Sequence, residues 1–179
     1  MSATTSLKRV DEFSNEDETK LHSLKSAVYP ESESASWAGR VREWAAPEWG
    51  VFVVDDRGDL VSYTGIVARD GLVDAAPVKT GGVGGVATHP DHRRRGYAAA
   101  GIDHALEFLR DHGADFAILV CENHLVDYYS RLGWRRFAGS VINRQHGNEE
   151  VFTFNEVMVI DLSSPAPVSG TIDVQGALW

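Results

Sequence analysis

Cysteine, long apolar runs and basic charge are all scarce in this chain of 179 residues. The single cysteine, Cys121, excludes an internal disulfide and fits a reducing cytoplasm. No apolar run approaches the roughly 20 residues that a membrane-spanning helix needs, so we expect a soluble protein with no membrane partner. Residues 1–8 are rich in serine and threonine and lack the apolar core of a secretory signal, which also favours the cytoplasm.

Acidic residues outnumber basic ones by 26 to 17, which gives a formal net charge of −9. This balance argues against nucleic acid as a partner and favours a cationic one. Against the acidic background, His89, His92 and Arg93–Arg95 form a dense basic cluster where we expect an anion to bind. The length fits one domain, residues 1–179, around a single core.

Apolar residues recur at helical spacing in several segments. Pro30 stops the first segment, and Gly113 follows the longest one, in which Ile102, Leu106 and Leu109 share a face. Trp37, Val41 and Trp44 share a face of the second. Helices are therefore predicted over residues 15–28, 34–45, 96–112 and 125–132.

Runs rich in β-branched and aromatic residues alternate with turn residues. A pair of such runs flanks the turn at residues 56–59, which predicts a hairpin, and Pro77 weakens a later run. The tail, residues 163–179, reads as irregular. Strands followed by a β-α-β-α-β stretch predict an α/β (α+β) fold, a mixed sheet with helices on its faces. The predicted strands are residues 50–55, 60–69, 73–79, 81–88, 116–121, 134–138 and 151–162.

The strand at residues 81–88 passes through the basic cluster straight into the longest predicted helix. Glycine within a strand suggests close approach of a ligand or of another backbone, and residues 81–85 read Gly-Gly-Val-Gly-Gly. A helix N-terminus presents unpaired N–H groups and partial positive charge, and arginine pairs with phosphate through two hydrogen bonds. This junction is therefore a candidate phosphate site.

Two motifs resemble those of the GNAT superfamily of N-acetyltransferases. Arg93-x-x-Gly96-x-Ala98 resembles the first signature, and residues 123–134, from Asn123 through a Tyr-Tyr pair to Gly133-Trp134, resemble the second. The resemblance implies a mixed, mostly antiparallel sheet with helices on both faces. It also implies that the fourth strand (81–88) and the fifth (116–121) splay apart around acetyl-CoA.

The resemblance further assigns residues to the co-substrate. The backbone of the fourth strand would pair with the pantetheine arm, the loop after it would wrap the pyrophosphate, and Asn123 would reach the pantetheine from the other side. The residues so implied are Val86, Ala87, Thr88, Arg93, Arg94, Arg95, Gly96, Tyr97, Ala98, Ala99 and Asn123.

Acetyl transfer to an amine needs a proton for the departing thiolate and a deprotonated amine. By resemblance Tyr129 supplies the proton, while Tyr128 faces the core. Glu122, at the end of a buried strand, is the best candidate for the base or for orienting the substrate, because partial desolvation would raise its pKa. His89 is second, and ordered water is an alternative. We expect Cys121 to be inert, and no metal site.

The C-terminal half resembles the aminoglycoside 2'-N-acetyltransferase branch, through Arg131-Leu132-Gly133-Trp134 and a tail ending in Trp179. In that branch the tail closes the acceptor site, and the carboxylate of the terminal tryptophan meets the substrate, so Trp179 is a candidate substrate residue. The branch has an acidic residue close to that tryptophan, whereas this tail has only Asp173. The acceptor therefore stays open among aminoglycoside-like sugars, polyamines, arylalkylamines and peptide N-termini.

The favoured function is transfer of acetyl from acetyl-CoA to a small cationic amine by direct attack in a ternary complex. A peptide or protein N-acetyltransferase and a non-catalytic acyl-CoA-binding regulatory domain are the alternatives. Homodimers are common in the superfamily, so a homodimer is a further expectation.

Overall fold

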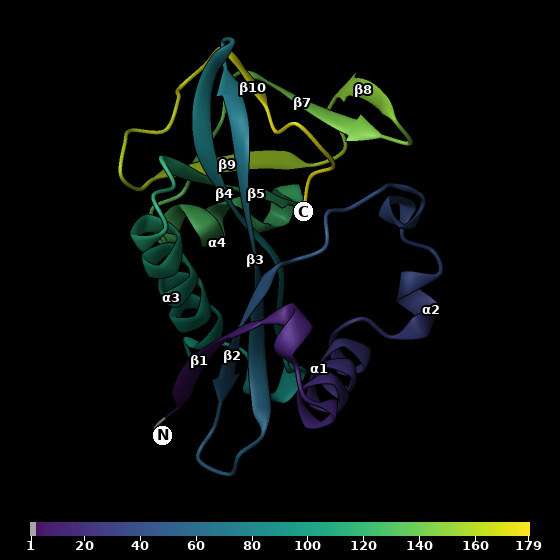
Figure 1. The fold of residues 1–179 in the computed structure, drawn as a ribbon. Helices are drawn as coiled ribbons and strands as arrows, with labels where there is room; N and C mark the ends of the chain where they lie inside the picture. Colours follow the sequence, from purple (N-terminus) through teal and green to yellow (C-terminus); the bar gives the residue numbers. More distant parts are fainter. Residues whose placement is uncertain (1–2) are drawn as a thin grey trace.

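Ten strands form one mixed sheet in the computed structural model, which describes residues 3–179 (Figure 1). The strands are β1 (Thr4–Arg9), β2 (Trp49–Val54), β3 (Leu60–Val73), β4 (Ala76–Thr88), β5 (Phe116–Cys121), β6 (Arg135–Arg136), β7 (Ser140–Gln145), β8 (Asn148–Val151), β9 (Glu156–Asp161) and β10 (Thr171–Asp173). Along the sheet they follow the order β6-β9-β5-β4-β3-β10-β7-β8, and β2 joins β1 to β3. The pairs β4–β5 and β10–β7 are parallel, and the other pairs are antiparallel.

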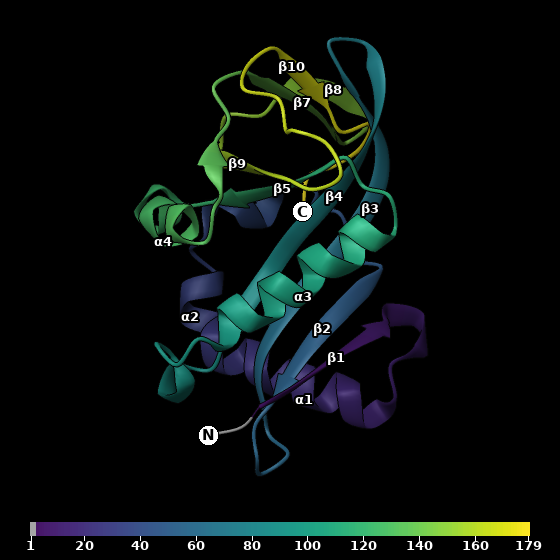
Figure 2. The same ribbon diagram turned by 90° about the vertical axis from the view of Figure 1, so that its left-hand side faces the viewer.

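Helices cover both faces of this sheet, as predicted. The α-helices are α1 (Asn15–Val28), α2 (Glu31–Ser34), α3 (Tyr97–Asp111) and α4 (Val126–Arg131), and the short 3-10 helices are η1 (Val10–Glu12), η2 (Ala38–Val41), η3 (Pro90–His92) and η4 (Asn123–Leu125). Helix α3 crosses one face diagonally, and α1 and α2 lie on the opposite face (Figures 1 and 2). Within residues 3–179, no helix is long and apolar enough to cross a membrane.

The predicted hairpin around residues 56–59 is confirmed as the pair β2 and β3. Strands β3 and β4 form a second, longer hairpin that was not predicted, because residues 76–88 form one strand where two were expected. The turn consists of Asp74 and Ala75, both with positive φ (47° and 68°), and the register then runs from Val73 opposite Ala76. Pro77 does not break the strand. It lies near the turn, before the residues of β4 that pair with β5, where the strand has a partner on one side only.

The helix predicted over residues 34–45 is wrong. Helix α2 ends at Ser34, and only the short η2 follows before β2. Trp37 and Trp44, which the helical spacing placed on one face, stack on each other instead, with ring centroids 5.8 Å apart. The Trp44 indole donates to the Gly39 carbonyl at 2.9 Å, so side-chain contacts add to the few short-range backbone hydrogen bonds of the segment, which do not continue as a helix.

The tail is not irregular throughout, because it contains β10. This strand lies between β3 and β7, with Ile172 opposite Val73 on one side and opposite Val141 on the other. Sequence patterns also missed β1, β7 and β8, and the strand expected over residues 151–162 is divided between the end of β8 and β9. The predictions of α1, α3, α4, β2 and β5 are confirmed, with ends that differ by at most one or two residues.

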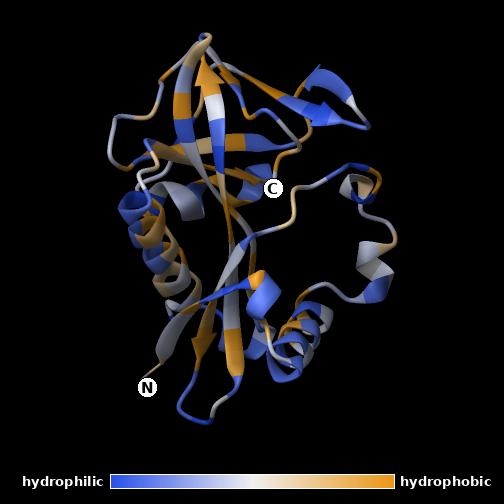
Figure 3. Ribbon diagram, in the orientation of Figure 1, coloured by the Kyte–Doolittle hydropathy of each residue, from blue (hydrophilic) through white to orange (hydrophobic). Residues whose placement is uncertain are grey.

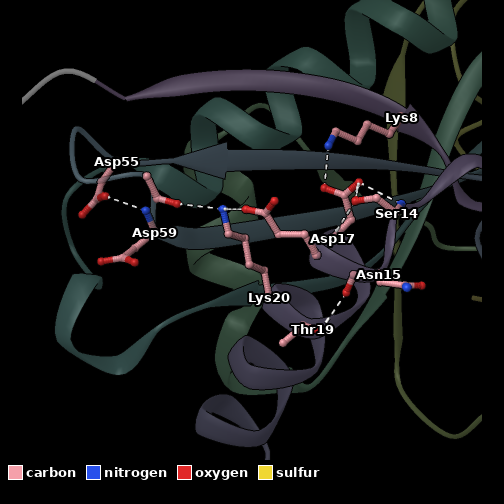
Figure 4. Close-up of polar contacts among 10 residues, drawn as sticks. Lys8, Ser14, Asn15, Asp17, Thr19, Lys20, Asp55 and Asp59 are labelled. Carbon is pink, nitrogen blue, oxygen red and sulfur yellow. Dashed lines mark hydrogen bonds and ion pairs between the residues drawn. The ribbon is translucent and has the colours of Figure 1, made fainter.

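Helix α1 begins with a capping box. The Ser14 hydroxyl accepts from the Asp17 amide, and the Asp17 carboxylate accepts from the Ser14 amide, so two otherwise unpaired N–H groups are satisfied (Figure 4). Lys8 from β1 donates to the same carboxylate, and Lys20 donates to the Gly58 carbonyl in the β2–β3 turn. These contacts fix α1 against the strands beside it.

Two large apolar clusters pack on the two faces of the sheet. On one face, Ile102, Leu106 and Leu109 of α3 pack with Ala117 and Leu119 of β5. On the other face, Ile118 belongs to a cluster that includes Ile172 and the tail residues Leu178 and Trp179. In Figure 3 the central strands are the most hydrophobic and the β7–β8 hairpin is largely hydrophilic. Since successive residues of β5 point to opposite faces, this strand is buried on both.

Candidate functional site

Strands β4 and β5 diverge after a short parallel contact. They pair only from Thr80 opposite Phe116 to Gly82 opposite Ile118, although β4 continues to Thr88 and β5 to Cys121. On its other side β5 remains paired with β9 as far as Cys121. Beyond Gly82, the backbone of β4 therefore lacks a strand partner on the β5 side, and the splayed wedge expected from the sequence is confirmed.

A β-bulge lies inside this wedge. Tyr63 pairs with Ala87 and Gly65 with Gly84, so Gly85 and Val86 together lie opposite the single residue Thr64. Gly85 has φ +58°, a left-handed conformation that glycine adopts without steric cost. The bulge therefore interrupts the regular register on the β3 side as well.

The loop between β4 and α3 leads directly into the N-terminus of α3, where backbone N–H groups have no partner within the helix. Arg93 is extended, Arg94 (φ +63°) and Gly96 (φ +83°) have left-handed conformations, and Gly96 is the N-cap of α3. No side chain caps the first turn of α3, which follows directly at Tyr97. The side chains of Arg93, Arg94 and Arg95 are exposed. The loop therefore fits the diphosphate of a coenzyme.

Tyr129 of α4 is the buried tyrosine of the Tyr-Tyr pair, with 7% of its surface exposed, while Tyr128 is only partly buried. This reverses the expectation that Tyr128 faces the core. Burial is the main cause that raises the pKa of Tyr129, so the phenol stays protonated at neutral pH. Among the described residues, the Tyr129 hydroxyl has no hydrogen-bond partner, and it is therefore available to donate to a ligand.

Glu122 and Asn123 follow the end of β5, and both are exposed. The Glu122 side chain is 55% exposed and lies 3.3 Å from His124, so the partial desolvation expected for this residue is not found. Asn123 accepts from the Arg136 guanidinium at 2.5 Å. A ligand that uses the Asn123 amide would share it with Arg136.

The contacts of the His89 side chain lie within the turn that follows β4. Its Nδ1 accepts from the Asp91 amide at 3.3 Å, and its ring contacts that of His92 edge to face. This contact stabilises the start of the loop that precedes α3. Cys121 is buried, and burial raises the pKa of its thiol to about 11, so it is a poor nucleophile, as expected.

The tail places Trp179 against the wedge. Its indole N–H donates to the carbonyl of Ile118 at 3.0 Å, the last β5 residue paired with β4. Gly82 and Gly84 make room for the ring, because a Cβ on Gly82 would lie 2.2 Å from the Trp179 ring. Arg69 holds the tail by donating to the Ala177 carbonyl at 2.8 Å. The glycines of β4 thus accommodate a side chain from this chain itself.

One residue of the wedge was not anticipated. Tyr29, which follows α1 and precedes Pro30, donates its hydroxyl to the Val86 carbonyl at 3.3 Å. Burial raises the pKa of Tyr29, and the charges of Arg93 and Glu122 also act on it. The sequence signalled only the end of a helix here, since the path of the chain after α1 decides where the ring lies.

The comparisons with known proteins agree with this geometry. A family model described as an acetyltransferase (GNAT) domain matches residues 9–137, whereas no match is found among curated proteins. A GNAT family N-acetyltransferase from Escherichia coli, solved with coenzyme A, superimposes with a TM-score of 0.64 at 18% identity, over 96% of this chain and 89% of that one. A GNAT acetyltransferase from Brucella melitensis, solved with acetyl-CoA, gives 0.57 at 16% identity, over 94% of each chain.

At these identities the superpositions establish the fold, while the family model covers the wedge, the loop and α4 together. The aminoglycoside 2'-N-acetyltransferase branch is not among the families that these comparisons identify. The chain belongs to the acetyltransferase (GNAT) domain family and is an acetyl-CoA-dependent N-acetyltransferase.

Proposed function

We propose that the protein transfers the acetyl group of acetyl-CoA to the primary amine of a small cationic acceptor, by direct attack in a ternary complex. The observation that carries this proposal is the wedge, which combines a backbone edge without a strand partner, a basic loop that leads into the uncapped N-terminus of α3, and a buried, protonated phenol. The net charge of −9 supports a cationic acceptor.

The loop before α3 is proposed to hold the diphosphate. Its N–H groups and the helix N-terminus favour negative charge, and the exposed guanidinium groups add charge-assisted hydrogen bonds. The unpaired edge of β4 is proposed to hydrogen-bond the pantetheine amides, as a strand partner would, with Asn123 on the opposite side. The proposed residues are Val86, Ala87, Thr88, Arg93, Arg94, Arg95, Gly96, Tyr97, Ala98, Ala99 and Asn123.

Acetyl-CoA, when bound, supplies an acetyl thioester whose carbon–sulfur bond breaks as the carbon–nitrogen bond forms. Tyr129 is proposed to give its proton to the sulfur, because its hydroxyl carries a proton at neutral pH and is not engaged by another described residue. Since burial raises the pKa of Tyr129 and makes the phenol a weaker acid, this transfer requires a direct hydrogen bond from the hydroxyl to the departing sulfur. The amine must lose a proton as well. Glu122, exposed at the rim beside His124, is proposed to receive that proton through water or to orient the amine.

Trp179 is proposed to line the acceptor side. It lies on the face opposite α3, where Ile118 and Val159 also lie, and its ring covers the glycines of β4. A site narrowed by a tryptophan favours a small amine over an extended peptide. A peptide or protein acceptor is the alternative, and it is distinguished by testing both kinds of amine.

The test is release of thiol from acetyl-CoA with a panel of small cationic amines and peptides, in wild type, Tyr129→Phe and the neighbouring control Tyr128→Phe. Loss of an acid catalyst costs about 10²-fold or more in kcat. We expect such a loss for Tyr129→Phe, with unchanged affinity for acetyl-CoA, and near wild-type rates for Tyr128→Phe. Binding of acetyl-CoA without thiol release for any amine would refute the proposal and leave a regulatory acyl-CoA-binding domain.

A further inference from the structure

Residues 29–46 bridge the open side of the wedge. At one end of this segment Tyr29 donates to the Val86 carbonyl of β4, and at the other end the Ala45 amide donates to the Leu178 carbonyl at 2.6 Å. In Figure 1 the segment arches out from α1 through α2 and returns toward the sheet, on the face opposite α3. It is therefore a wall of the acceptor side, fixed both to the strand that binds the co-substrate and to the tail.

This wall carries an aromatic cluster. Trp37 and Trp44 stack at an interplanar angle of 19°, and the Phe154 ring meets each of them edge-on at 6.2 Å. Trp44 and Phe154 pack against the same apolar cluster that contains Trp179. Phe154 also lies two residues before Glu156, which pairs with Cys121 at the end of β5. The cluster thus lies beside the tail and close to the end of β5, which Glu122 follows.

Trp37 is the exposed member of the cluster. Its surface is 41% exposed, yet the ring has a defined seat on Gly39, where a Cβ would lie 2.2 Å from it. Large aromatic rings that are fixed but uncovered are typical of binding surfaces, because a ligand gains apolar contact without the entropic cost of ordering them. The exposed part of the Trp37 ring is therefore available to a ligand.

The charges around the cluster suit a cation. Arg42 packs its guanidinium over the Phe152 and Phe154 rings, 5.4 Å and 5.6 Å from their centroids, and also pairs with Glu150, so its charge is compensated. Glu43 at the rim is 48% exposed and pairs only with His146 among the described charges. Because Arg42 and Glu150 compensate each other, the groups left to attract an ammonium ion are the Glu43 carboxylate, through Coulomb attraction, and the exposed part of the Trp37 ring, through cation–π attraction.

We propose that Trp37, Trp44 and Phe154 form a subsite for the aromatic body of the acceptor, so that the acceptor is an arylalkylamine. This inference rests on the proposed function and names its substrate class. A polyhydroxylated amino sugar would place hydroxyl groups against these rings without hydrogen-bond partners, which costs binding energy. The chain thereby selects acceptors by the flat apolar group that carries the amine.

The first experiment compares kcat/KM for 2-phenylethylamine, ethylamine and glucosamine. Wild type should prefer 2-phenylethylamine over the other two by at least about tenfold, the discrimination that one apolar subsite provides. Trp37→Ala should reduce that preference by about tenfold and leave ethylamine unchanged, while Trp37→Phe retains most of it. Gly39→Ala should have the same effect as Trp37→Ala, because the new Cβ displaces the Trp37 ring although the tryptophan itself is still present. Val168→Ala, a change at another exposed apolar residue, is the control.

The second experiment measures binding of 2-phenylethylamine to the protein loaded with coenzyme A, by calorimetry, in wild type and Trp37→Ala. Weaker binding to Trp37→Ala supports the subsite even if no amine is acetylated, in which case only the proposed function fails. If amines are acetylated but show no aromatic preference, or if Trp37→Ala affects all amines alike, the subsite is refuted and the proposed function stands. No binding and no turnover would overturn both.

Discussion

Substitution of Gly96 tests whether the loop conformation is needed by the bound co-substrate. Gly96 has φ +83°, and a Cβ there would meet no atom within 4 Å, so a new side chain acts only through backbone strain. Alanine in this left-handed conformation costs roughly 1–2 kcal/mol, whereas asparagine adopts it more readily. Both variants remove the freedom of glycine from the unfolded chain, so the comparison of Gly96→Ala with Gly96→Asn isolates the strain.

The strain must appear in one of two measurable quantities. If the free loop keeps its shape, Gly96→Ala unfolds more easily than Gly96→Asn by about 1 kcal/mol. If the free loop relaxes, stability is spared and acetyl-CoA binds more weakly, by about fivefold for 1 kcal/mol. We therefore predict that the difference in unfolding free energy between the two variants and their difference in free energy of acetyl-CoA binding add up to about 1 kcal/mol. Urea unfolding of the free protein and calorimetry with acetyl-CoA give both terms, and equal stability together with equal affinity for the two variants would refute the reasoning.

The other predictions concern the tail, α1 and the unanticipated tyrosine. Gly82→Ala should displace the Trp179 ring and lower the free energy of unfolding, measured in urea, by about 1–3 kcal/mol. The hydrogen bond from Lys8 lowers the pKa of Asp17 from its usual value of 3.8, so the ionised carboxylate stabilises the fold above pH 3.8, and this stabilisation is lost as the pH falls. The difference in unfolding free energy between wild type and Asp17→Asn should therefore shrink from pH 5 to pH 2. Tyr29→Phe should change KM for acetyl-CoA or amine at unchanged Tm, and unchanged kinetics would exclude a role for this hydroxyl at the wedge.

The sequence predicted elements whose local signals agree with their tertiary contacts. Helix α1 has a capping box at its start, and α3 has a continuous apolar face that packs on β5. Strand β7 was missed because its inward positions include Asn143 and Gln145, which are buried and hydrogen-bonded to each other. Polar residues at buried positions conceal the alternation that identifies a strand.

The candidate site also has a part that local sequence signals predict and a part that they do not. The loop that we propose for the diphosphate could be identified from the sequence, because its backbone groups are consecutive in one short motif. Tyr29 and the ring stack of Trp37 on Trp44 depend on how the segment after α1 crosses the sheet, and no short motif encodes that path. The helical spacing of Trp37 and Trp44 correctly indicated that the two rings meet. It was wrong about the backbone, because the rings stack across an irregular segment and do not share a face of a helix.

Because of the position of β10, the acceptor side of the site can lose its structure while the co-substrate side keeps its own. Among the strands that the structure describes, β7 and β8 pair with the rest of the sheet only through this three-residue strand, and Arg144 reinforces the connection by pairing with Asp173. Phe152 follows β8, its amide donates to the Val141 carbonyl of β7, and its ring contacts Trp44 of the wall (residues 29–46). The position of the wall therefore depends on β7 and, through β10, on the tail. The edge of β4, the loop and α3 are assembled without β10. Slippage or cleavage in the tail should therefore release the wall that faces the acceptor while the co-substrate side remains assembled.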